Sequence, residues 1–251
     1  VGAGLLQNGS FVRWGLCNDS TAVNRRVKSG DLIGIRGGDY LITEAGFGAD
    51  MGAERFFNIK CRASGLVPDA AVLVTTVRAL KAHSGKYKIV AGKALPPELL
   101  ADNPADVEAG GENLRQQIEN VKAHGVTPVV AINSFPTDHK SEHDAIRKIA
   151  ESAGARVAVC THFADGGKGA IELARAVEEA CNEKNNFHFL YKSEASLKEK
   201  IEAVATTIYG AAKVEYSATA NKQLKNYTDN GFADLPVCIA KTHLSISGDA
   251  S

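Results

Sequence analysis

The stretch ENLRQQIENVKAHGVTPVVAINSFPTDH, residues 112–139, decides the fold class. In its first half, Leu114, Ile118 and Val121 recur at the spacing that places apolar side chains on one face of a helix. Gly125 stands where a helix usually stops. Val126 to Ile132 is then an almost continuous apolar run, which is typical of a strand buried on both faces. A helix that leads directly into a buried strand predicts a βαβ unit.

The same alternation continues on both sides of this stretch, with a long excursion or flap expected at residues 84–111. We expect strands at 40–43, 70–77 (AAVLVTTV, buried on both faces) and 156–160, and helices at 53–62, 141–152 and 169–182. Ser141 is the expected N-cap of its helix. Repeated alternation of strand and helix favours right-handed crossovers. The sequence therefore predicts an α/β fold, a mostly parallel sheet flanked by helices.

After residue 185 the βαβ spacing is lost. We expect helices at 197–209 and 217–230, a strand-like segment at 187–191, and a strand or buried loop at 235–240. This pattern predicts a smaller C-terminal α+β subdomain, part of a second domain. The expected organisation is an N-terminal segment over 1–38, an α/β core over 39–185, and the partial subdomain over 186–251.

Composition excludes several classes of function. Lys plus Arg and Asp plus Glu both number 29, and a balanced charge argues against a dominant role in binding nucleic acid or a membrane surface. No apolar run reaches the roughly 18 residues that span a bilayer. The five cysteines are odd in number and contain no C-x-x-C, which favours reduced thiols over disulfides or zinc. We therefore expect a cytoplasmic protein that does not bind nucleic acid or membranes.

Polar or glycine-rich residues follow each predicted strand. These segments are Thr43–Glu44, Thr75–Arg78, Asn133–Asp138 and Thr161–Lys168. In parallel sheets, ligands bind beyond the carboxyl ends of the strands. The recurrence of such segments at one end of the predicted sheet indicates one composite site.

Residues 133–138 (NSFPTD) admit two interpretations. The amide of Asn133 could donate to and accept from a purine edge, and the ring of Phe135 could stack on a base. Alternatively, the segment is a plain strand-to-helix turn, because Asn, Pro, Thr and Asp are all common in turns.

Three weaker motifs each have a structural alternative. The glycine-rich residues Glu44–Gly48 and Asp165–Gly169 could hold an anion on backbone N–H groups, or could be a tight turn and a capping loop respectively. His139 and His143 have the i, i+4 spacing of metal ligands, but no third ligand is near in sequence, so we expect a solvated helix face. We predict no metal site.

Seven collinear segments resemble formate–tetrahydrofolate ligases, and the resemblance covers most of residues 39–247. They are TEAGFGADMGAERFFNIKCR (43–62), LVTTVRALKAHSG (73–85), ENLRQQIENVKAHG (112–125), VVAINSFPTDH (129–139), THFADGGKGAIELA (161–174), KIEAVATTIYGA (200–211) and LPVCIAKTHLSIS (235–247). The resemblance implies ATP-dependent ligation of formate to tetrahydrofolate through formyl phosphate, giving 10-formyltetrahydrofolate. It implies ATP with Mg²⁺ and tetrahydrofolate as bound substrates, no prosthetic group, and a homo-oligomer.

The resemblance also implies which residues bind the nucleotide and folate, although it assigns no catalytic residue. The expected binding residues are Glu44, Phe47, Gly48, Asn133, Phe135, Pro136, Thr137, Asp138 and Phe163. Phe163 stands where the family pattern T-H-W-A-x-G-G-x-G has Trp, so it keeps a stacking face but lacks the indole N–H.

The chain departs from the family pattern in its phosphate-binding part. The motif G-x-x-x-x-G-K-[ST] does not occur, and no family match is found by motif in Val1–Gly38. We therefore expect an internal piece of a P-loop NTPase-like core, incomplete and with weak or absent ligase activity alone. Lys168 and Arg78 are candidate substitutes for the missing phosphate ligands. The alternative expectation is a non-catalytic folate- or nucleotide-binding module, or a scaffold fragment of the family.

Overall fold

The computed structural model describes residues 2–5, 11–14, 25–46, 48–89, 92–239 and 246. These residues form two compact units. Unit 1 comprises the described parts of Val1–Val67 and His188–Ser245, and unit 2 those of Pro68–Phe187 and Ile246–Ser251. Each unit is described by itself.

Unit 2 is built on a parallel sheet with the order β3-β4-β5. Its strands are β3 (Ala70–Thr75), β4 (Thr127–Asn133) and β5 (Arg156–Cys160). Thr75 lies opposite Ile132, and Asn133 lies opposite Cys160, so the three strands end together. The α/β fold predicted from residues 112–139 is thereby confirmed.

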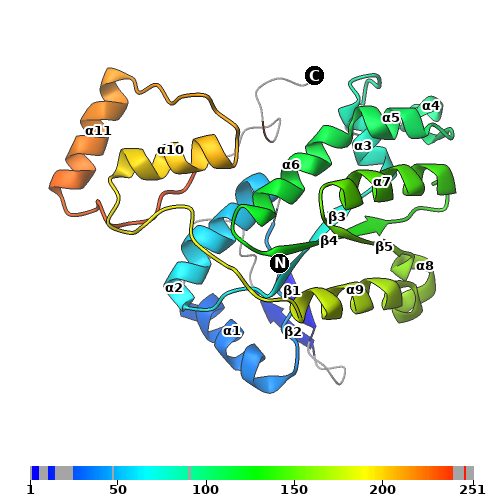
Figure 1. Ribbon diagram of the computed structural model, residues 1–251, viewed down its shortest axis with the longest axis horizontal. Helices are drawn as coiled ribbons and strands as arrows, with labels where there is room; N and C mark the ends of the chain where they lie inside the picture. The colour runs from blue at the N-terminus through cyan, green and yellow to red at the C-terminus, as the bar shows by residue number, and fades with distance from the viewer. Residues whose placement is uncertain are drawn as a thin grey trace. The chain divides into compact units, whose positions relative to one another are not determined.

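Helices cover both faces of this sheet (Figure 1). On one face lie α6 (Gly111–Lys122) and α7 (Lys140–Ser152), and on the other lies α9 (Ile171–Cys181). The predicted apolar face of α6 is buried: Leu114, Ile118 and Val121 are at most 4% exposed. Gly125 has φ +73°, the left-handed conformation expected of a helix stop. Local periodicity was therefore enough to place this helix and the strand after it.

Two expectations about the start of unit 2 are wrong. The predicted strand 70–77 ends at Thr75, and α3 (Val77–His83) begins two residues later. The strand is also not buried on both faces, because Val72 and Val74 are 42% and 69% exposed. Among the described residues no strand pairs with its second edge, so β3 is an edge strand of this sheet.

The expected flap at 84–111 is partly helical and packed. It contains α4 (Pro97–Leu100) and α5 (Pro104–Ala109), and each has proline in its first turn. The buried Asp106 carboxylate accepts hydrogen bonds from Lys86 and Tyr87. These bonds tie the start of the excursion, at Lys86 and Tyr87, to α5.

The start of α7 also differs from the prediction. Its N-cap is His139 rather than Ser141, because the Glu142 side chain accepts from the His139 backbone N–H at 3.0 Å. Ser141 lies inside the first turn and donates to Asp102. The carboxylate three residues into the helix therefore decides where it begins.

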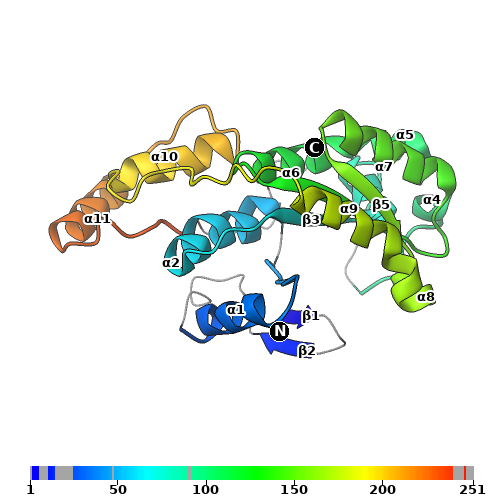
Figure 2. The ribbon, with the colours of Figure 1, turned by 60° about the horizontal axis from the view of Figure 1, so that its bottom comes forward.

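Unit 1 is mostly helical. Its amino-terminal elements are the antiparallel pair β1 (Gly2–Leu5) and β2 (Phe11–Trp14), α1 (Arg25–Gly37), two π-helical segments η3 (Ala49–Ala53) and η4 (Phe56–Cys61), and α2 (Arg62–Ser64). The β1–β2 pair lies beside α1 (Figure 2). The helix predicted at 53–62 is therefore present, but most of it, residues 56–61, is π-helical.

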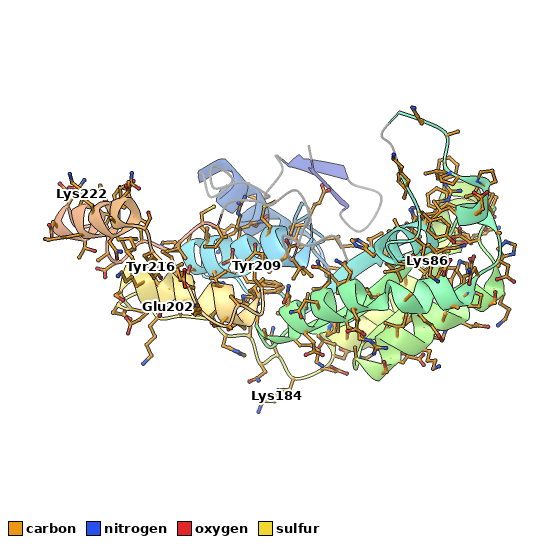
Figure 3. All side chains as sticks on the ribbon, turned by 90° about the horizontal axis from the view of Figure 1, so that it is seen from above. Lys86, Lys184, Glu202, Tyr209, Tyr216 and Lys222 are labelled. Atoms are coloured by element: carbon orange, nitrogen blue, oxygen red, sulfur yellow. The ribbon has the colours of Figure 1, made fainter. Side chains whose placement is uncertain are left out.

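The carboxyl-terminal part of unit 1 contains α10 (Leu197–Thr207) and α11 (Ala218–Asp229), close to the predicted bounds. Tyr216, between them, donates to Glu202 of α10 at 3.4 Å (Figure 3). The strand expected at 40–43 and the strand-like segment expected at 187–191 are not formed by the described residues there. Of the two alternatives for 235–240, a strand or a buried loop, residues 235–239 form a loop in which Val237 and Ile239 pack, partly buried, against the cluster around Tyr191, and Ala240 lies outside the described residues. Within 186–239 the described chain contains helices and extended segments but no strand.

No helix in the described part of the chain is long and apolar enough to cross a membrane.

Candidate functional site

The carboxyl edge of the unit 2 sheet gathers three of the polar segments that the sequence singled out. Thr76 and Arg78 follow β3, residues 133–138 close β4, and Thr161 follows β5. Because the strands end in register, these segments share one edge. The prediction that polar residues meet at this edge is borne out within unit 2.

The loop after β4 is held by its own hydrogen bonds. Asp138 is the centre: its carboxylate accepts from the Phe135 backbone N–H at 2.9 Å, and its own N–H donates to the Phe135 carbonyl at 3.0 Å. The Asp138 side chain is only 2% exposed, and the His143 ring lies 3.5 Å away. The Ser134 N–H donates to the Cys160 carbonyl at 3.0 Å, which ties the loop to β5. Asp138 therefore serves to build the turn.

Arg78 lies over this loop. Its guanidinium carbon is 4.2 Å from the centre of the Phe135 ring, within the range of a cation–π interaction. Its Nη2 donates to the Thr137 hydroxyl at 2.8 Å. Pro136 and Thr137 are exposed at the rim. The result is a cluster of one cation, one aromatic ring and one hydroxyl, which we call the Arg78 cluster (Arg78, Phe135 and Thr137).

Sequence reasoning named all three residues but did not predict their contact. Arg78 stands on the first turn of α3, whose N-cap Thr76 accepts from the Ala79 N–H at 3.1 Å. The signal for the contact was the position of Arg78, three residues beyond a strand that is parallel to β4.

A buried ion pair supports the cluster from behind. Lys81 of α3 contacts the Glu142 carboxylate of α7 at 2.6 Å, and both side chains are at most 1% exposed. Lys81 also donates to the Ala101 carbonyl at 2.6 Å, while Glu142 accepts from the Asn103 N–H at 3.1 Å. Since Glu142 also holds the His139 N–H, the pair joins α3, the excursion and the loop after β4. This pair was not found from the sequence.

The segment after β5 is a compact capping loop. It contains α8 (His162–Asp165) and the 3₁₀ turn η5 (Gly166–Ala170). Thr161 donates to the Asp165 carboxylate at 2.7 Å, and its N–H donates to the Gly169 carbonyl at 3.0 Å. A Cβ at Gly169 would lie 2.5 Å from the Thr161 carbonyl carbon, so that glycine permits close packing. These contacts favour the capping-loop interpretation.

Phe163 and Lys168 project from this loop. Phe163 is 92% exposed, an unusual position for a large aromatic ring. Lys168 is exposed and, in the residues that the structure describes, makes no ion pair. Both side chains are therefore accessible at the same sheet edge as Thr161.

The remaining predicted residues, Glu44, Phe47 and Gly48, belong to unit 1. Glu44 is exposed, and Phe47 lies outside the described residues. The Gly48 carbonyl accepts from the Met51 and Gly52 N–H groups at 3.3 and 2.9 Å, which starts the helix that follows. A Cβ at Gly52 would lie 1.5 Å from the Gly46 carbonyl oxygen. Close backbone packing therefore requires a glycine at position 52.

The described residues contain no group of three or more His, Cys, Asp or Glu side chains that could hold a metal. The expected solvated face at His139 and His143 is wrong, because both residues are half-buried: His143 faces Asp138, and the His139 ring is 3.4 Å from the Leu100 carbonyl. The cysteines of the described residues, Cys61, Cys160, Cys181 and Cys238, are free thiols.

Comparison with known proteins identifies the family. A profile of formate–tetrahydrofolate ligases matches residues 22–251. The chain belongs to the formate–tetrahydrofolate ligase family. The match includes residues 22–38, which the motif comparison had left outside the resemblance.

Several relatives carry this family name. A formate–tetrahydrofolate ligase of Saccharopolyspora erythraea is 66% identical over 221 residues, covering 88% of this chain and 39% of the relative. Formate–tetrahydrofolate ligase 3 of Rubrobacter xylanophilus is 64% identical, covering 87% of this chain and 40% of the relative. One from Cutibacterium acnes is 59% identical, covering 88% and 39%. The chain thus spans about 40% of the length of the curated formate–tetrahydrofolate ligases that it matches.

Proposed function

We propose that this chain contributes the base- and folate-facing part of a formate–tetrahydrofolate ligase. The single observation that carries the proposal is the Arg78 cluster at the carboxyl edge of the unit 2 sheet, in a chain of this family. Ligands of open α/β sheets bind at that edge. A flat heterocycle such as adenine or pterin is the ligand that suits an aromatic platform there.

The roles we propose follow from the chemistry of each side chain. Phe135 and the exposed Phe163 would offer stacking faces, and Asn133 would read the polar edge of a ring. Pro136 and Thr137 would line the rim, while Asp138 would act indirectly by holding the loop. For unit 1, Glu44, Phe47 and Gly48 stay proposed ligand residues on the family resemblance.

The proposed reaction of the whole ligase has two steps. Formate attacks the γ-phosphorus of ATP, giving formyl phosphate and ADP, and tetrahydrofolate then attacks the formyl carbon and releases phosphate. Phosphoryl transfer depends on positioning and charge neutralisation, commonly by a P-loop lysine and Mg²⁺. That motif does not occur in residues 1–251, so we propose that this chain alone binds substrates without efficient turnover. Mg²⁺ would arrive with the nucleotide phosphates, since it needs only one or two protein carboxylates.

We further propose a homo-oligomer, a P-loop NTPase-like core completed by the remainder of the ligase, and a cytoplasmic location. Free thiols in the described residues support a reducing compartment. The alternative function is a non-catalytic folate- or nucleotide-binding module or scaffold of the same family.

Calorimetry with ATP and with tetrahydrofolate, beside an assay for 10-formyltetrahydrofolate, tests the proposal. We expect binding with little or no product, and a loss of affinity of about 10-fold in Phe135→Ala, because base–aromatic stacking contributes about 1–3 kcal/mol. Phe163→Trp should restore the family side chain and tighten binding. Phe232→Ala is the control, since that ring is 50% exposed in unit 1.

The outcomes separate the candidates. Robust product formation by the pure chain would contradict the proposed lack of turnover. Binding of one ligand with no contribution to turnover after the rest of the ligase is supplied would favour the binding-module alternative. Failure of the chain to bind either ligand would refute both the proposed function and the binding-module alternative, and would leave the scaffold alternative.

A further inference from the structure

Arg78 has hydrogen-bonding capacity that its surroundings do not use. Its Nε is buried and, among the described residues, has no hydrogen-bond partner. Its Nη2 is committed to a neutral acceptor, the Thr137 hydroxyl, rather than to a carboxylate. Within the described part of the chain Arg78 makes no ion pair, whereas Arg147 and Arg156 of the same unit each contact glutamates.

Such an arrangement is costly unless a ligand completes it. A buried donor without an acceptor loses the hydration that it had in the unfolded chain. Phe135 and Thr137 nevertheless fix the guanidinium plane, which reduces the entropy lost when it binds a ligand. A fixed guanidinium with a free donor is matched to the two oxygens of a carboxylate or phosphate.

We propose that Arg78 is the anchor of an oxyanion subsite at the carboxyl edge of β3 and β4, adjoining the Phe135 platform. The ligand group is a phosphate or carboxylate oxyanion, bound by the Nε–H and a second N–H of the guanidinium. This inference rests on the proposed function for the identity of the ligand, and it adds to that function the residue that holds the ligand's negative charge.

The ligands of the proposed function offer two sources of such a group, and paired titrations distinguish them. ATP and adenosine share a base but differ in phosphates. Tetrahydrofolate and 6-methyltetrahydropterin share a reduced pterin, but only tetrahydrofolate carries carboxylates. Each pair is titrated calorimetrically into the full chain and into Arg78→Met, Arg78→Lys and Thr137→Val.

Arg175→Met is the matched control, because Arg175 is an exposed arginine of α9 with no ion pair among the described residues. Circular dichroism establishes that each variant is folded. Thr137→Val keeps the Arg78 charge and its contact with Phe135 and removes only the hydrogen bond from Nη2, so it tests the subsite even if Arg78→Met is unstable.

We expect Arg78→Met to weaken binding of the oxyanion-bearing member of one pair by about 10- to 100-fold, which is the size expected for a lost hydrogen bond to a charged group. Binding of the neutral member of that pair should weaken by much less. Arg78→Lys should recover only part of the loss, because an ammonium lacks the planar fork. If the variant loses affinity only for ATP, the subsite binds phosphate. If it loses affinity only for tetrahydrofolate, the subsite binds carboxylate. Equal effects on both members of each pair, or no effect, would overturn the proposal.

A measurement that uses neither ATP nor tetrahydrofolate separates this inference from the proposed function. Pyrophosphate and formate are tested for thermal stabilisation of wild type, Arg78→Met and Arg175→Met. Stabilisation by either anion that is lost only in Arg78→Met supports the subsite, even if wild type binds neither ATP nor tetrahydrofolate and the proposed function fails. No stabilisation of wild type by either anion, or the same stabilisation in all three, overturns the subsite.

Discussion

At the scale of single residues, a substitution that breaks the ion pair of Lys81 and Glu142 should have a large effect on stability. Both side chains are buried, and each also binds backbone groups of the excursion. We expect Glu142→Gln to lower the free energy of unfolding by about 3–5 kcal/mol, because it leaves the Lys81 charge buried without its counter-ion. Urea denaturation followed by circular dichroism measures the loss.

Asp144→Asn provides the comparison, since it breaks an ion pair with Lys140 whose side chains are 56% and 86% exposed. That change should cost less than about 1 kcal/mol. A double variant, Lys81→Met with Glu142→Gln, should lose less than the sum of the two single losses, because the two groups are in contact. Similar losses for Glu142→Gln and Asp144→Asn would show that the buried pair is unimportant.

A second residue, Glu54 of unit 1, predicts a dependence of stability on pH. Burial raises the pKa of its carboxyl to about 7, although the Asn58 amide and the Arg55 charge act to lower it. The unfolded value is near 4.5, so between these pH values the folded state binds more protons than the unfolded state. The free energy of unfolding should therefore fall as pH rises from about 4.5 to 7, by about 3 kcal/mol in all.

Glu54→Gln removes the titrating group and should flatten this part of the pH profile, making the variant more stable than wild type at pH 8. Urea midpoints between pH 4 and 8 give the profile for both proteins. Glu194→Gln is the control, because Glu194 is exposed in the same unit. A slope that persists in Glu54→Gln would assign it to other groups.

At the scale of elements, close packing of α3 against the start of α6 depends on Gly110. A Cβ there would lie 1.8 Å from the Leu80 carbonyl oxygen, and the glycine has an ordinary φ of −89°. We therefore expect Gly110→Ala to destabilise by about 3 kcal/mol through overpacking alone.

Gly167→Ala tests whether the loss is steric. Gly167 is in the same unit, and a Cβ there would meet nothing within 4 Å. Gly167→Ala should alter the free energy of unfolding by no more than about 0.5 kcal/mol, as most surface substitutions do. Thermal unfolding of both variants provides the measurement, and equal losses would contradict a packing role for Gly110.

The elements that could be predicted are those specified by their own periodicity. β4, β5, α6, α7 and α10 each carry a complete apolar pattern, and each is present, whereas α11 is present although it buries no residue. The segments 40–43, 187–191 and 235–239 have strand-like composition but lack a partner strand among the described residues, and strand propensity does not supply one. The short helices α4 and α5 begin at proline, a signal that was available in the sequence.

The candidate site was predictable only as a location. The parallel direction of the strands follows from the βαβ pattern, so the polar segments of unit 2 could be assigned to one edge. The contacts of Arg78 with Phe135 and of Lys81 with Glu142 join residues far apart in the sequence, and no local pattern encodes such pairs. The same limit applied to Asp138, whose role in the turn depends on the orientation of its carboxylate.

At the scale of the whole molecule, the balanced charge and the exposed apolar surface both favour self-association. The formal net charge is zero, and the sequence pI is about 7.2, so little electrostatic repulsion keeps copies apart near neutral pH. Among the residues described, Val74 on the edge strand β3 is 69% exposed. Unpaired strand edges with apolar side chains are common sites of self-association.

We therefore expect reversible association at pH 7.2, seen in sedimentation equilibrium as a mean mass that rises above 26.5 kDa with concentration. The association should persist in 0.5 M NaCl, because burial of apolar surface is not screened by salt as exposed charge pairs are. Val74→Lys should weaken it, since lysine on an edge strand opposes pairing. Ile171→Lys adds the same charge at a residue that is 48% exposed on α9 and should have little effect. A monomer at all concentrations, or association that salt abolishes, would contradict an apolar origin, and equal effects of the two lysines would exclude the β3 edge as the contact.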